Sequence, residues 1–272
     1  MIINSGALHT QIHEWMNSNS SYFQVTSSDF RNIGTKPVRL IPTYSFDELP
    51  PALLDVGLEQ IRNQMGECLL IKRAQMNFPT LFPTLPELEV IEMDKPPKFP
   101  VKLRLLKYDE LHNEETGIVL VTEFGLYDHF FKEVLSLDES FTFGCRIKTT
   151  ANGDFFIGGE KIPVKKCLLE IDNFLEGSML LVPVEVIFSK KGRIRTSFSI
   201  HQFALPTLLL SQYSSKRIYS LFQIYSILGM ETLSFKFYLY DMKYSPGVMD
   251  THSYSFVNGF QYLVHYDRSM FL

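Results

Sequence analysis

Cysteine is scarce in this sequence, and its three copies lie far apart. Cys68, Cys145 and Cys167 form no CxxC pair, so a zinc site built on clustered thiolates is not expected. A sparse, odd count fits a reducing compartment, where disulfides rarely persist. No apolar run approaches the roughly 20 residues that a membrane-spanning helix needs. The first residues also lack a basic start followed by an apolar stretch, so we expect a cytoplasmic protein.

Several catalytic signatures are missing as well. The chain has no HExxH, GxSxG or P-loop pattern, and its seven histidines are scattered. A strong excess of positive charge is also lacking, because the formal net charge is −4. This argues against a protein that coats nucleic acid by bulk attraction, but it leaves room for a local basic face around an acidic site.

Aromatic residues are abundant, with 23 Phe and 13 Tyr, and most of them should lie in a core. Apolar periodicity predicts helices over 7–18, 116–134 and 199–212 and a shorter helix over 45–54. Extended runs over 38–44, 67–73, 141–149, 153–164, 166–172, 179–188, 217–227 and 231–240 predict strands. The order of these elements indicates an α/β (α+β) protein with a mixed central β-sheet flanked by helices.

Turn signals refine this picture. Asn152-Gly153 predicts a hairpin between the strands on its two sides, because Asn-Gly favours the tight turn that hairpins use. Further turns are expected at Gly158-Gly159 and near Gly177.

The stretch 77–100 is rich in proline, which breaks helices and holds the backbone extended. We interpret it as a boundary between an N-terminal region, 1–100, and a core, 101–272. An ordinary surface connection within one domain explains the prolines equally well.

Two carboxylates stand in apolar strands that a short turn joins. In KCLLEID, Glu170 and Asp172 share one face, and in MLLVPVEVIF, Glu185 shares a face with Ile187. If the strands pair in the right register, Asp172 and Glu185 meet, and a few carboxylates plus waters suit Mg²⁺. The alternative is that these acids lie on an exposed face of the sheet.

Several segments, taken in their order, resemble those of type II restriction endonucleases of the PD-(D/E)XK nuclease superfamily. That group has an apolar-Glu-apolar-Asp strand, a tight turn, a strand ending in Glu-x-Lys, and then a helix. The similar segments here are RLIPTYSFDELPPALL at 39–54, GCRIKT at 144–149, LEID at 169–172, VEV at 184–186 and SFSIHQFALPTLLL at 197–210. The resemblance implies a restriction-endonuclease-like core with an N-terminal recognition region.

Carried over by position, the resemblance makes Asp172 and Glu185 ligands of Mg²⁺. It makes Glu123, in the helical segment VTEFGLYDHFF, an auxiliary acid, and Gln202 the helical glutamine beside the site. His201, next to this glutamine, is more typical of a packing residue than of a ligand.

One departure from the family pattern concerns the catalytic lysine. Its expected position, two residues after Glu185, is occupied by Ile187, which can neither orient a water nor offset charge on a phosphate. Lys190 lies five residues beyond Glu185, about 17 Å along a regular strand and on the opposite face. Lys191 has the right face but lies farther away, and Lys166 has the same problem. A bend near Gly192 would be needed for Lys190 or Lys191 to substitute.

The basic run SKKGRIR at 189–195 follows this site. Its cations, Lys190, Lys191, Arg193 and Arg195, are candidates for contacts with DNA phosphates. An ordinary solvated hairpin tip has the same composition.

The resemblance implies a Mg²⁺-dependent enzyme that cuts double-stranded DNA at a short sequence. A homodimer is expected for a palindromic site, since two-fold symmetry supplies one catalytic centre per strand. A cognate DNA methyltransferase is the expected partner in such a restriction system. The alternatives are a DNA-binding relative or recognition subunit that has lost catalysis, and an unrelated interaction protein whose carboxylates are incidental.

Overall fold

The computed structural model describes residues 6–20, 22–26, 29, 57–64, 67–72, 80–93, 111–137, 140–144, 146–157, 159–189, 195–229 and 231–266. These residues form two seven-stranded sheets and four α-helices. The mixed α/β class predicted from the sequence is thus confirmed, with the strands divided between two sheets. The expected strand at 38–44 and the expected helix at 45–54 lie outside the described residues.

The first sheet combines strands from both ends of the chain. Its order is β1 (Tyr22–Thr26), β3 (Glu67–Lys72), β2 (Leu58–Gln64), β7 (Glu160–Ile171), β6 (Ile147–Ile157), β13 (Val248–Asp250) and β12 (Tyr244–Ser245). A long antiparallel ladder joins β6 to β7, whereas β2 meets β7 through the single pair Gln64↔Lys165. The edges of β2 and β7 therefore diverge beyond this pair.

The second sheet contains the strand that carries Glu185. Its order is β4 (Glu89–Met93), β14 (Ser255–His265), β11 (Thr232–Asp241), β10 (Arg217–Leu228), β9 (Leu180–Phe188), β8 (Asn173–Glu176) and β5 (Thr142–Phe143). β9 pairs in parallel with β10 and antiparallel with β8. The predicted turn near Gly177 is confirmed, because it connects β8 to β9.

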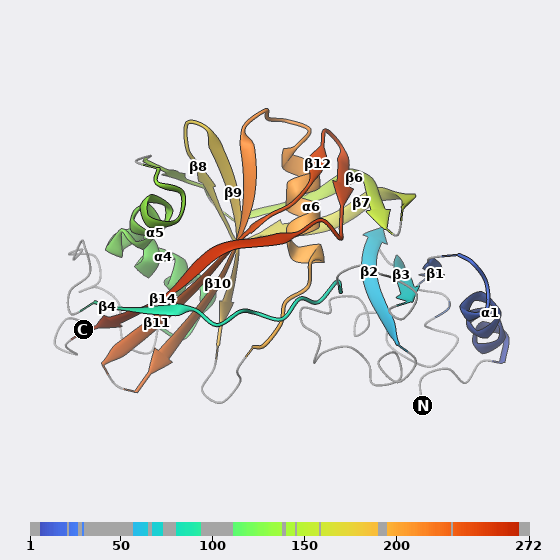
Figure 1. Cartoon of the computed structure of the whole chain (residues 1–272), viewed down its shortest axis with the longest axis horizontal. Coiled ribbons are helices and arrows are strands. Elements are labelled where there is room, and N and C mark those ends of the chain that lie inside the picture. The colour runs from blue at the N-terminus through green and yellow to red at the C-terminus, as the bar shows by residue number, and fades with distance from the viewer. Residues whose placement is uncertain are drawn as a thin grey trace.

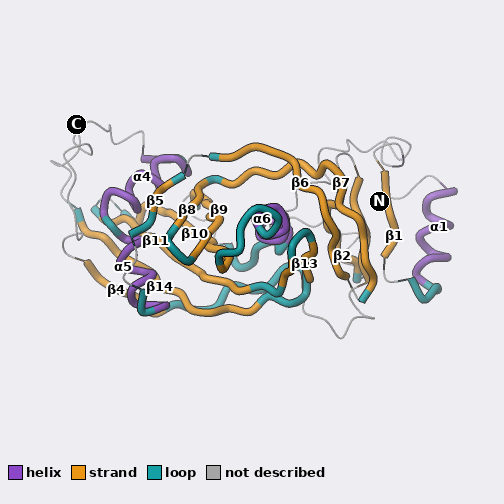
Figure 2. Tube along the Cα trace, turned by 90° about the horizontal axis from the view of Figure 1, so that it is seen from above, coloured by secondary structure: helices purple, strands orange, loops and turns teal. Residues whose placement is uncertain are grey.

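The helices occupy distinct places around the sheets (Figure 1). They are α1 (Gly6–Met16), α4 (Glu114–Phe124), α5 (Leu126–Leu135) and α6 (His201–Leu210). α4 and α5 pack on the second sheet against β9 and β14, while α6 contacts strands of both sheets. Figure 2 shows α6 in the middle of the molecule, enclosed by strands. Within the described residues, no helix is both long and apolar enough to cross a membrane.

Two local signals explain why the predicted helix at 116–134 is split in two. The Asn113 side chain accepts a hydrogen bond from the Thr116 amide and so caps the start of α4. Gly125 has φ +71°, a left-handed conformation that glycine adopts without steric cost, and it ends α4 just before α5 begins.

Two apolar clusters hold these layers together. One surrounds α6 between the sheets and includes the fully buried rings of Phe198, Phe203 and Phe222. The other lies between the second sheet and the helices α4 and α5, around Phe130 and Phe237. Beyond its polar first turn, α6 is mostly apolar, because strands of both sheets pack around it.

The hairpin predicted at Asn152-Gly153 is wrong. β6 runs straight through these two residues, and the chain reverses at the second predicted turn, beside Gly159. Gly153 sits at a β-bulge with φ +147°, a conformation that glycine alone adopts easily. The Asn152 side chain accepts a hydrogen bond from the Lys166 amide across the ladder. The Asn-Gly pair therefore bends a strand here and does not end it.

Strands from both sides of residue 100 share each sheet. In the first sheet β2 joins β7, and in the second sheet β4 pairs in parallel with β14. The described part of the proline-rich stretch, 80–93, also packs on the core, because Leu81 and Phe82 belong to the cluster around α6 and the Leu85 amide donates to the carbonyl of Thr196.

Candidate functional site

Asp172 lies where the chain leaves the first sheet and enters the second. It is the single residue between β7 and β8, and its side chain is only 11% exposed. One residue further on, Asn173 pairs with Val184, so the ladder extended by one step sets Asp172 opposite Glu185. The chain bends there, and the Asp172 carboxylate accepts a hydrogen bond of 2.9 Å from the Val186 amide. The side-chain oxygen of Asp172 thereby replaces the backbone carbonyl that a regular ladder would offer to the Val186 amide of β9.

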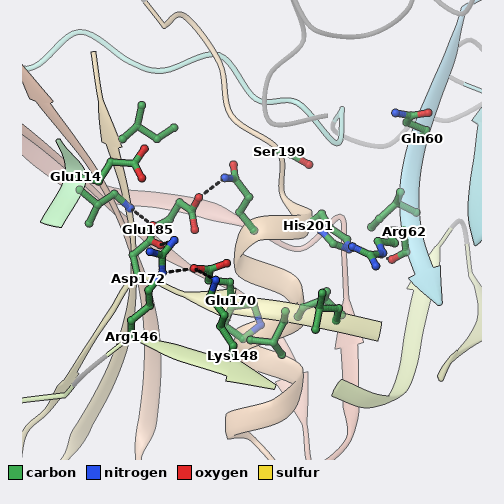
Figure 3. Close-up of a pocket in the computed structure, with 18 of the residues that line it drawn as sticks. Gln60, Arg62, Glu114, Arg146, Lys148, Glu170, Asp172, Glu185, Ser199 and His201 are labelled. Carbon is green, nitrogen blue, oxygen red and sulfur yellow. Dashed lines mark hydrogen bonds and ion pairs between the residues drawn. The ribbon is translucent and has the colours of Figure 1, made fainter. Parts of the chain in front are cut away.

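Glu185 projects from β9 toward α6. Its neighbours Val184 and Val186 pack into the cluster under α4 and α5, whereas Ile187, two residues on, packs into the cluster around α6. The alternation predicted for this strand is therefore confirmed. Gln202, in the first turn of α6, donates a hydrogen bond from its amide nitrogen to Glu185 (Figure 3). Its other polar atom, Oε1, is buried without a hydrogen-bond partner among the described residues.

Asp172 and Glu185 open into one cavity of about 470 Å³. It lies between the diverging edges of β2 and β7, next to β9 and the start of α6. Its charged and polar lining consists of Gln60, Arg62, Glu114, Arg146, Lys148, Glu170, Asp172, Glu185, Arg195, Ser199, His201 and Gln202. Both predicted ligands are thus brought together, with further acids and several cations around them.

Two of the cations come from β6 and from the residue just before it. Lys148 is paired in the ladder with Glu170, and its Nζ lies 3.3 Å from the Glu170 Oε1 atom. Arg146 forms an ion pair with the same carboxylate, and its Nη2 lies 3.8 Å from the Oδ1 of Asp172. Figure 3 shows Arg146 beneath Asp172 and Lys148 beside Glu170. Glu170 therefore holds two cations at the edge of the cavity.

The pKa values of the two central carboxyl groups are both raised. Burial raises the pKa of Asp172 to about 6, and Glu114 and Glu170 add to the rise, while the Val186 amide and Arg146 oppose it. Burial, and then the charge of Asp172, raise the pKa of Glu185 well above its usual value, against the hydrogen bond from Gln202 and the charge of Arg195. Such a pair favours either bound protons or a bound cation between its oxygens.

The donor set fits Mg²⁺ better than a softer metal. Among the described residues, no three His, Cys, Asp or Glu side chains are grouped to hold an ion. Mg²⁺ does not require such a cage, because it keeps several waters and binds through one or two carboxylates together with substrate phosphate. Asp172 and Glu185 are two carboxylates of this kind, and the amide of Gln202 beside them donates to Glu185.

The other predicted site residues have different outcomes. Glu123 lies on α4 but does not line the cavity, whereas Glu114, in the first turn of the same helix, does. Arg195 lines the cavity, and its charge acts on Glu185. Lys190, Lys191 and Arg193 lie outside the described residues.

His201 is a structural neighbour of the site. Its Nε2 lies 3.0 Å from the carbonyl oxygen of Arg62, and this contact ties α6 to β2. Burial lowers the pKa of His201 to about 4, so it is neutral at physiological pH. The packing role predicted for it agrees with this contact.

Sequence reasoning missed Glu114, Arg146 and Lys148. The segment GCRIKT resembles part of the nuclease pattern, but the Asn-Gly signal predicts that it pairs with 153–164. The true partner is β7, which ends at Ile171 just before Asp172, and this register places Lys148 beside Glu170. The alternation of Arg146 and Lys148 along one face of the strand was the available signal.

Comparison with known proteins gives one match. No curated protein and no solved structure matches the chain. A family model described as "Domain of unknown function (DUF6997)" matches residues 80–263, which is more than half of the chain and includes Asp172, Glu185 and α6. The chain therefore belongs to the DUF6997 family.

Proposed function

We propose that this protein is a restriction-type endonuclease that hydrolyses double-stranded DNA at a specific sequence with Mg²⁺. The observation that supports this most is the meeting of Asp172 and Glu185 in one cavity edged by Arg146, Lys148 and Arg195. Carboxylates that bind a hard cation, with cationic side chains beside them that attract phosphate, suit the hydrolysis of a phosphodiester.

Each side chain has a role in this proposal. Asp172 and Glu185 would hold Mg²⁺, which when bound polarises a phosphate and lowers the pKa of a water. The Asp172 carboxylate is fixed by the Val186 amide, and Glu185 is oriented by Gln202. Lys148, kept at the cavity edge by Glu170, would offset the charge that develops on the phosphate.

Ile187 favours a second candidate function. It is 7% exposed and packs in the core around α6. The position at which PD-(D/E)XK nucleases carry their lysine therefore contributes no charge here. If Lys148 does not serve in its place, the protein would be a recognition subunit that binds DNA without cutting it. The two candidates differ in cleavage and agree in binding.

The test uses the purified full chain with unmethylated DNA and Mg²⁺, beside Asp172→Asn and Glu185→Gln. These variants keep the shape of each side chain and remove its charge. Discrete fragments from the wild type alone support the endonuclease. Sequence-selective binding without fragments supports the recognition subunit.

Absence of DNA binding at low salt by a folded wild-type protein would reject both candidates. Arg217→Gln is a matched control, because this cation forms an ion pair with Asp241 and does not line the cavity. Its cleavage pattern should equal that of the wild type.

A further inference from the structure

The outer face of the β6–β7 hairpin carries a row of cations that leads to the cavity. We define this ribbon face by its exposed residues Lys148, Lys161, Lys165, Lys166 and Leu168. The opposite face of the hairpin packs into the cluster around α6. Lys148 and Leu168 also line the cavity, so the ribbon face and the site are continuous.

A β-bulge places two lysines side by side on this face. Along β7 the exposed residues are Lys161, Pro163 and Lys165 before the bulge, and Leu168 after it. Lys166 is the extra residue that changes the alternation, so that Lys165 and Lys166 both face solvent. Without the bulge, one of them would have to point into the core.

The backbone at this bulge is in a costly conformation. Lys166 has φ +45°, in the left-handed region that glycine and asparagine tolerate better than lysine. The Asn152 side chain holds the strand there by accepting from the Lys166 amide. Strain retained at an exposed lysine points to a use for that side chain outside the fold itself.

Charge pairing separates these two lysines from their neighbours. Lys148 pairs with Glu170, and Lys161 pairs with Asp154 at 2.9 Å. Within the described part of the chain, neither Lys165 nor Lys166 has an ion-pair partner, and both are exposed. The uncompensated positive charge of the ribbon face is therefore concentrated at the bulge.

We infer that the ribbon face binds the phosphate backbone of duplex DNA and leads it to the cavity, with Lys165 and Lys166 as the main contacts. This inference rests on the proposed action on DNA. From Lys161 to Glu170 the strand extends about 30 Å. That length corresponds to about nine base pairs of duplex at 3.4 Å per step. Contacts of this kind position the duplex and carry no sequence information.

The experiment measures how the affinity of the full chain for a duplex of about 20 base pairs depends on salt, without divalent metal, from about 50 to 200 mM KCl. The test variant is Lys165→Gln with Lys166→Asn, because asparagine tolerates the left-handed backbone at the bulge. The control is Lys132→Gln with Lys236→Gln, which removes the same charge from α5 and β11, away from the hairpin (Figure 1). Thermal unfolding confirms that both variants are folded.

In a plot of the logarithm of affinity against the logarithm of salt concentration, the slope of the test variant should be shallower than that of the wild type by about 1.8, since each phosphate contact contributes about 0.9. The control should keep the wild-type slope. An unchanged slope in the folded test variant overturns the inference, even if the wild type cuts DNA. A reduced slope in a protein that never cuts DNA supports the inference and rejects only cleavage. Binding to anionic vesicles that depends on these lysines, without DNA binding, also overturns the inference.

Discussion

At the scale of single residues, the proposed cleavage of DNA depends on Lys148. It comes from β6, lies 3.3 Å from Glu170 and lines the same cavity as Asp172 and Glu185. An ammonium group at that place can offset negative charge on a phosphate, whereas the Ile187 side chain is apolar and buried in the core.

Replacing Lys148 by alanine should lower the rate of DNA cleavage by about 100-fold, as expected for loss of one group that stabilises transition-state charge. Single-turnover cleavage measures the rate, and binding at fixed salt measures affinity, which should change far less. Lys132→Ala is the matched control, because Lys132 lies on α5, outside the ribbon face and away from the cavity. Equal rates for the two variants would remove Lys148 from the reaction.

The acids at the site make stability depend on pH in a definite direction. The native pKa of Asp172 is about 6, above its ordinary value of 3.8, so the folded state holds this proton more tightly than the unfolded chain does. Stability from the protonated group is complete below about pH 4 and is lost as pH rises through 6. The rise from 3.8 to about 6 corresponds to about 3 kcal/mol.

Two measurements test this loss of stability with rising pH. Asp172→Asn should unfold at a higher temperature than the wild type at pH 8, and the two should converge near pH 4. Mg²⁺ should stabilise the wild type more at pH 8 than at pH 5.5, because binding requires the deprotonated carboxylates, and it should not stabilise the variant. Thermal unfolding with and without Mg²⁺ checks both. Equal stabilisation of wild type and variant would place the ion elsewhere.

At the scale of elements, the bulge where β6 pairs with β7 sets how β6 aligns with the site. A Cβ at Gly153 would lie 2.6 Å from the carbonyl oxygen of Gly247 and 2.8 Å from Leu208. A side chain there would push β6 away from β13 and α6.

Gly153→Ala should therefore lower the free energy of unfolding by about 1–3 kcal/mol, through overpacking and an unfavourable φ. Gly159→Ala is the comparison, because Gly159 also has positive φ but no heavy atom lies within 4 Å of its added Cβ. That variant should cost about 1 kcal/mol. Urea unfolding measures both, and a larger loss at Gly159 would contradict this account of the bulge.

The sequence predicted one helix over 116–134, whereas the structure has two. Asn113 caps α4 and the left-handed Gly125 ends it, and both signals depend on neighbouring residues alone. Asn152-Gly153 misled because the same dipeptide suits a turn or a bulge, and long-range pairing with 160–171 chooses between them.

At the scale of the whole molecule, the N-terminal strands and the core share their apolar interior. Ile61, Leu69 and Ile71 belong to the cluster around α6, together with Leu81 and Phe82 from the proline-rich stretch. The family match begins at residue 80, between these two groups.

The fragment 101–272 should be less stable than the fragment 80–272, and both should be less stable than the full chain. The shorter fragment loses Leu81 and Phe82 from the core and loses β4, which pairs with β14. Thermal unfolding of the three proteins tests the order. An unchanged midpoint for 101–272 would show that the region 1–100 folds apart from the core.

The sequence by itself determined the mixed α/β class, the alternation that sets Glu185 against Val184 and Val186, and the choice of Asp172 and Glu185 as a pair, because these depend on side-chain period and short turns. Only the tertiary structure decided which strand stands beside Glu170, and so which lysine reaches the site. That choice depends on contacts between residues far apart in the chain, in which Lys148 and Glu170 meet across a hairpin whose turn lies at Gly159. The local sequence pattern does not specify this register, since a turn at Asn152-Gly153 and a turn at Gly159 both suit the same residues. In the structure the turn lies at Gly159, and the inner face of the hairpin packs against α6.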